Sequence, residues 1–141
     1  MFEWLIDYFW RMPRFRASTK SVSSSDMATK IQSPFPKAQL HLMDNKSWLM
    51  PRAELEKAVF DDWTDKFRFI AERFDCADFA FHLKQVFAHN GVNSVGVVID
   101  ASWRHAYNII MFTDGERALF EPQDDKFIRA VTLNEHALII M

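Results

Sequence analysis

The most regular hydrophobic pattern of the chain lies in residues 73–91. Its apolar side chains recur at the spacing of one helix face, at Phe79, Ala80, Leu83, Val86 and Phe87. Cys76 falls on the same face, three residues before Phe79, and Asn90-Gly91 is a typical helix end. We therefore predict an amphipathic helix that packs on a core and has the chain's single cysteine in its first turn.

The pattern differs on the two sides of this segment. Before it, Pro51 suits the first position of a helix, and apolar residues follow at four-residue spacing, at Leu55, Val59 and Trp63. After it, residues 94–100, 105–112 and 117–121 have the composition of strands, and residues 128–133 and 137–141 are candidates for further strands. Helices followed by consecutive strands predict an α+β fold in which N-terminal helices pack on an antiparallel β-meander.

The first 33 residues have a different character. Residues 1–16 are predicted to form an aromatic amphipathic helix that Pro13 ends, and residues 17–33 have the serine-rich composition of a linker. The folded domain is then residues 34–141. Three roles stay open for residues 1–16, which are packing on the domain, docking on a partner protein, and binding a membrane surface.

Composition excludes several classes. A chain of 141 residues holds one domain and a short appendage, and one cysteine cannot form an internal disulfide. The net charge of −2 does not favour nucleic acid as a partner, and three glycines argue against a phosphate-binding loop. No apolar run approaches the roughly 20 residues of a transmembrane helix, and Glu3 and Asp7 interrupt any signal peptide. The expected location is the cytoplasm or an assembled particle.

Three residues in chain order have the chemistry of a nucleophilic site. Cys76 begins the predicted helix, His105 begins a strand, and Glu121 ends the next strand. A helix N-terminus stabilises a thiolate, an imidazole accepts the proton, and a carboxylate orients the imidazole. A small buried structural thiol is the alternative for Cys76.

The hairpin between these strands tests the idea. A two-residue loop at Asp114-Gly115 would place Glu121 opposite Asn108, on the other face from His105. A three-residue loop with a glycine bulge would instead pair Glu121 with Tyr107 or Ile109, on the histidine's face. The triad requires the second register.

Three short motifs carry a family resemblance. Residues 74–80 (FDCADFA), 105–108 (HAYN) and 120–123 (FEPQ) resemble the papain-like cysteine peptidase domain of the Marasmius oreades agglutinin type. The resemblance covers roughly residues 50–125. It implies a papain-like fold in which Cys76 is the nucleophile, His105 the base and Glu121 the residue that orients the base. It also implies activation by calcium.

One position departs from that family's pattern. The family has Cys-Asp-Asp where this chain has Cys76-Ala77-Asp78, so only Asp78 is left as a calcium ligand. Calcium takes six to eight oxygen ligands, and the missing carboxylate therefore puts the ion in doubt. The chain has no lectin repeat, so sugar binding is not expected to carry over. Asp61-Asp62 and Asp124-Asp125 are expected at the solvated surface.

Two functions follow as expectations. The first is a cysteine hydrolase, a peptidase or amidase that attacks a protein or peptide substrate through an acyl-enzyme, with the Cys76 N–H as an oxyanion donor. The second is a non-catalytic structural or adaptor protein of a larger assembly, such as a phage particle, docked through residues 1–16.

Overall fold

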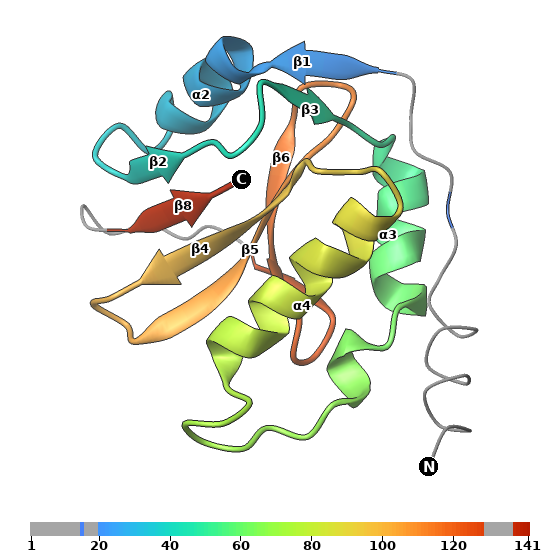
Figure 1. The fold of residues 1–141 in the computed structure, drawn as a ribbon, viewed down its shortest axis with the longest axis vertical. Helices are drawn as coiled ribbons and strands as arrows, with labels where there is room; N and C mark the ends of the chain where they lie inside the picture. Colours follow the sequence, from blue (N-terminus) through green and yellow to red (C-terminus); the bar gives the residue numbers. More distant parts are fainter. Residues whose placement is uncertain (1–14, 16–19, 129–136) are drawn as a thin grey trace.

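A mixed sheet with helices on both faces makes up the fold in the computed structural model (Figure 1). The structure describes residue 15, residues 20–128 and residues 137–141. Its elements are β1 (Ser21–Ser23), α2 (Ser24–Gln32), β2 (Gln39–His41), β3 (Lys46–Trp48), α3 (Arg52–Asp61), the 3-10 helix η1 (Thr64–Lys66), α4 (Cys76–His89), β4 (Val95–Asp100), β5 (His105–Met111), β6 (Arg117–Glu121), β7 (Lys126–Ile128) and β8 (Leu138–Ile140). Within these residues, no helix combines the length and apolar character needed to cross a bilayer.

Local signals set both ends of α4. The Asp75 side chain accepts a hydrogen bond from Ala77 N at 3.0 Å, and the Asp78 side chain accepts one from Asp75 N at 2.9 Å. This reciprocal capping box satisfies backbone donors that a helix N-terminus leaves unpaired. At the other end Gly91 takes a φ of 78°, which glycine adopts without steric cost. The predicted helix is confirmed, and its apolar face is buried.

The sheet is not the simple meander that the sequence predicts. Its strand order is β2-β8-β4-β5-β6-β7, and β4 to β7 are antiparallel neighbours in chain order. The last strand, β8, lies between β2 and β4, antiparallel to β4 and parallel to β2. The expected antiparallel meander is corrected in this respect, because pairing between distant segments leaves no local pattern in the sequence.

The β5–β6 hairpin has the longer of the two loops considered. Met111 pairs with Arg117, and Phe112 N donates to Glu116 O at 2.9 Å, so the loop is residues 113–115. Gly115 has a φ of +85°, as the glycine of a bulged three-residue loop does. The pairing of Asn108 with Phe120 then places Tyr107 opposite Glu121. The register that the triad requires is confirmed.

The segment predicted as a linker contributes to the core. Met27 and Ile31 of α2 are 0% exposed and pack with Tyr107 and Ile109 of β5. Ser23 caps α2 by accepting a hydrogen bond from Asp26 N at 3.1 Å. The linker prediction is wrong for residues 21–32, because serine favours both helix caps and linkers and composition does not separate the two. Of the predicted N-terminal helix, residues 1–14 and 16 lie outside the described residues, as do residues 129–133 of the strand predicted at residues 128–133.

The two faces of β5 contact different helices. Tyr107, Ile109 and Met111 pack in the cluster that contains α2, whereas Ile110 and Phe112 pack in the cluster that contains α3 and α4. Figure 1 shows α4 running across β4 and β5. This arrangement brings the N-terminus of α4 to the end of the sheet where β5 begins.

Candidate functional site

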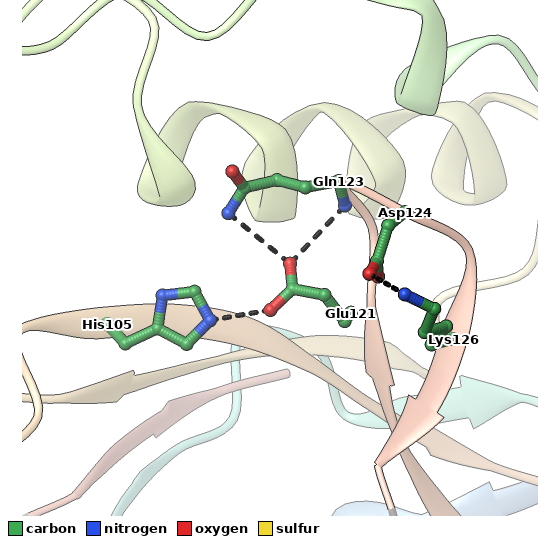
Figure 2. Close-up of polar contacts among 5 residues, drawn as sticks. All are labelled: His105, Glu121, Gln123, Asp124 and Lys126. Carbon is green, nitrogen blue, oxygen red and sulfur yellow. Dashed lines mark hydrogen bonds and ion pairs between the residues drawn. The ribbon is translucent and has the colours of Figure 1, made fainter.

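The most clearly formed polar contact among the predicted site residues joins His105 and Glu121. His105 Nε2 lies 2.5 Å from Glu121 Oε2, and the two side chains are 32% and 18% exposed (Figure 2). Gln123 donates to the other carboxylate oxygen, Glu121 Oε1, from its backbone N at 3.3 Å and its Nε2 at 3.4 Å. One carboxylate oxygen of Glu121 therefore binds the His105 ring, while the other oxygen accepts hydrogen bonds from Gln123 in the turn that follows β6.

Backbone pairing explains why these side chains meet. The β5–β6 register places Glu121 opposite Tyr107, and side chains two residues apart on a strand share a face, so His105 is a diagonal neighbour of Glu121. On its other side, His105 pairs with Asp100 of β4. Asp100 Oδ1 accepts hydrogen bonds from Ser102 N at 3.1 Å and Ser102 Oγ at 2.6 Å. This carboxylate therefore anchors the turn that leads into His105.

Cys76 is the first residue of α4 and is half-buried. It packs against a small cluster of Ala80, Val97 and Ala106, so it lies near the start of β5. Ala106 faces α4, and strand alternation directs His105 from β5 toward the other face, together with Tyr107. Within the described residues, Cys76 Sγ makes no hydrogen bond. The structure thus joins His105 to Glu121 and places Cys76 beside the next residue of the strand, without a direct bond to the ring.

The ring nitrogens of His105 have distinct roles. Nε2 is occupied by Glu121, and Nδ1 points away from that carboxylate (Figure 2). An imidazole held by a carboxylate at one nitrogen can accept a proton at the other. The N-terminus of α4 supplies a partial positive charge at Cys76. Chemically, the arrangement contains a base with an orienting acid and a thiol at a helix terminus.

The residues around Asp78 do not fit a calcium site. Asp78 is exposed, and its carboxylate accepts the capping hydrogen bond from Asp75 N. Across the part of the chain that the structure describes, no group of three or more His, Cys, Asp or Glu side chains is arranged to hold a metal ion. No step is therefore assigned to calcium.

Two supporting residues were missed by the sequence analysis. Gln123 belongs to a quoted motif but received no role, although its position two residues after Glu121 suits a hydrogen bond within the turn. Asp100 lies at the end of a strand, where aspartate often accepts hydrogen bonds from the backbone of the following turn. The sequence signal was present in both cases but is common in ordinary turns.

Comparison with known proteins shows the family of most of this chain. The model of the ricin-type beta-trefoil lectin C-terminal domain matches residues 31–141. The Polyporus squamosus lectin bound to the human-type influenza-binding epitope Neu5Aca2-6Galb1-4GlcNAc is 20% identical with a TM-score of 0.63, and the match covers 77% of this chain and 45% of that one. The PSL1a-E64 complex is 18% identical with a TM-score of 0.68, covering 86% and 51%. No curated protein matches.

These similarities extend to the fold, and the chain spans about half the length of the solved structures. They correct the predicted family, because the matching family model and the first of these structures are described as lectins and not as papain-like cysteine peptidases. The prediction of a papain-like α+β core is also wrong. The fold of this chain matches part of the chain in each of these solved structures. The expected cysteine hydrolase and the alternative phage structural or adaptor protein lose their support together.

Proposed function

The chain belongs to the family of ricin-type beta-trefoil lectin C-terminal domains, and we propose that it serves as a module of a lectin-type protein with a thiol-reactive site at Cys76, His105 and Glu121. The contact of 2.5 Å between His105 Nε2 and Glu121 Oε2 carries the proposal. A half-buried imidazole with an oriented carboxylate beside it is suited to proton transfer. Neither a peptide nor an amide substrate is part of this proposal.

The position of Cys76 supports the same reading. It is the chain's single cysteine, it lies in the first turn of α4, and its packing cluster includes Ala106, the neighbour of His105. Because strand alternation directs His105 to the opposite face of β5 from Ala106, transfer of the thiol proton to His105 Nδ1 requires the imidazole to reach Cys76 past the end of the sheet where β5 begins. The transfer would leave a thiolate and an imidazolium that attract one another. In the reaction with iodoacetamide, the thiolate attacks the carbon that carries iodine, so a sulfur–carbon bond forms, the carbon–iodine bond breaks and iodide leaves, while Glu121 keeps the imidazolium in place.

Alkylation of Cys76 tests this proposal. The rate of reaction with iodoacetamide is measured between pH 5 and 9 from the mass of the intact protein. Because the thiolate is the reacting form, we expect His105→Ala to slow alkylation at pH 7 by at least about tenfold, and Glu121→Gln by a smaller factor. E64, the small molecule of the PSL1a complex, serves as a second probe, with binding expected to the native protein and not to Cys76→Ala.

The matched control is His89→Ala, since His89 is an exposed histidine of α4, the helix that also carries Cys76. It is expected to react at the native rate. If Cys76 of the His105→Ala variant is alkylated as fast as Cys76 of the His89→Ala variant across the pH range, the imidazole of His105 does not act on the thiol. The proposal is then overturned.

Carbohydrate binding is the second candidate. It is supported by the sugar complex of the similar Polyporus squamosus lectin and by Trp103, which is 62% exposed two residues before His105. Under this candidate, Neu5Aca2-6Galb1-4GlcNAc changes the tryptophan fluorescence of the chain, and Trp103→Ala removes most of the change because aromatic rings are common contact surfaces in ligand sites. A titration without any change would reject it for this chain.

A further inference from the structure

Three carboxyl groups with unsatisfied oxygens lie near one another away from the thiol site. Asp62 follows α3 and is 3% exposed. Its Oδ1 accepts a hydrogen bond from Thr64 N at 2.6 Å, while its Oδ2 is buried without a hydrogen-bond partner among the described residues. Asp65 of η1 also has a buried Oδ1 without such a partner, and its other oxygen pairs with Lys66. A buried carboxylate oxygen without a donor is costly when it is charged.

The third carboxyl group comes from a distant segment. Asp125 lies in the turn between β6 and β7, has a φ of 54°, and likewise buries an unpartnered Oδ1. Asp62 and Asp65 both act on it electrostatically. The turn that contains Asp125 is closed by the pairing of Glu121 with Lys126. The ring centroids of Phe60 in α3 and Phe127 in β7 lie 6.0 Å apart. The three acids therefore lie where the α3–η1 segment and the β6–β7 turn come together.

The charges around this junction do not balance when every acid is ionised. Lys66 is the nearby cation, and Asp124 adds further negative charge while pairing with Lys126. From α4, His82 Nδ1 lies 2.9 Å from Thr64 Oγ1, and burial lowers the pKa of this histidine, which favours its neutral form. The described acids are not arranged to hold a metal ion. Protonation of these acids would neutralise the excess negative charge.

The pKa values agree with this geometry. Burial is the main cause that raises the pKa of Asp62 to about 6 and the pKa of Asp125 to about 7, and the neighbouring carboxylates add to the effect at Asp125. An exposed aspartate of the unfolded chain releases its proton near pH 3.8. The folded protein therefore retains protons at these sites that the unfolded chain has released.

We propose that the junction between the α3–η1 segment and the β6–β7 turn is a proton-dependent latch. The β6–β7 turn is stabilised against the α3–η1 segment when Asp62 and Asp125 are protonated, and repulsion between the carboxylates destabilises it when they are ionised. The latch is closed at acidic pH and loosens toward neutral pH. It acts on the turn that follows Glu121, so it would set how firmly that residue is held. The inference stands on the acids of the junction and does not depend on Cys76.

The direction of the pH effect follows from proton linkage. A group whose pKa is raised by folding stabilises the protein fully below its unfolded value, and that contribution is lost as the pH rises through its folded value. For Asp62 and Asp125 the loss extends from about pH 4 to about pH 7. Asparagine imitates the protonated side chain at all pH values and tolerates the left-handed backbone of position 125.

Thermal unfolding between pH 4 and 8 tests the latch, with Asp125→Asn and Asp62→Asn compared to the native protein. The melting temperature of each variant is expected to match the native one near pH 4, to exceed it increasingly up to pH 7, and to remain several degrees higher at pH 8. Hydrogen exchange at pH 8 is expected to be slower in residues 122–127 of the Asp125→Asn protein than in the native turn.

Asp61→Asn is the matched control, because Asp61 is exposed, neighbours Asp62 and pairs with Lys57. Its melting temperature is expected to keep the native dependence on pH. A difference between Asp125→Asn and the native protein that is the same at every pH, or that equals the difference of the control, would overturn the latch. Unchanged exchange in residues 122–127 at pH 8 would do the same.

Discussion

Replacing Asn108 with alanine is expected to lower the free energy of unfolding by about 3 kcal/mol. Asn108 is 0% exposed, and its Nδ2 donates at 2.9 Å both to Ala80 O of α4 and to Gly96 O of β4. One side chain therefore fastens the helix that carries Cys76 to the sheet. Alanine would remove both hydrogen bonds and leave a cavity between the two layers.

Urea unfolding measures this loss from the shift of the midpoint at constant slope. Gln85→Ala, on the exposed side of α4, is the control and is expected to stay within about 0.5 kcal/mol of the native protein. A loss at Asn108 no larger than that of the control would show that α4 is held to the sheet by apolar contacts alone.

The second large effect is expected at Gly96, where alanine should destabilise the protein by about 2 to 3 kcal/mol. A Cβ atom at this position would collide with Met141 Sδ and would lie 2.8 Å from Ile140 O and 3.0 Å from Ile109 Cγ2. The methionine sulfur can move aside, but Ile140 O belongs to the backbone of β8. The strand would therefore have to shift away from β4.

Hydrogen exchange locates this effect, because loss of protection is expected first in residues 138–141 and then in β2, which pairs with β8. Ala88→Gly on the exposed side of α4 provides a scale of about 1 kcal/mol for an ordinary helix substitution. If Gly96→Ala costs less than that and leaves β8 protected, the close approach of the two strands is not limiting.

Local patterns predicted those elements whose signals lie within a few residues. The helix of Cys76 carried its apolar stripe, its capping aspartates and its terminal glycine within one segment, and each acts over a single turn. The Asp114-Gly115 signal placed the β5–β6 loop correctly, and the two candidate registers followed from counting residues. The choice between the registers still needed the structure, because one residue of loop length changes the face of every side chain.

Patterns of composition predicted less well. Residues 21–32 have the serine content of a linker, yet Met27 and Ile31 are buried at helical spacing. Two apolar residues are a weak signal, and only the surface that they meet on β5 makes them part of a core. In the same way, Asp62 has the sequence context of a surface doublet, yet it is only 3% exposed and acts electrostatically on Asp125, more than 60 residues later.

For the site, the sequence alone determined which chemical groups are present and on which elements they begin: a thiol at a helix start, an imidazole at a strand start and a carboxylate at the end of the next strand. Tertiary structure decided which of them meet, joining His105 to Glu121 through the hairpin register and leaving Cys76 beside Ala106 on the helix side of β5. The reason is physical. Helix caps, turns and side-chain periodicity act between near neighbours in the chain. In contrast, the face of the sheet on which a side chain lies, the insertion of β8 and the charge balance of buried acids depend on segments that only folding brings together.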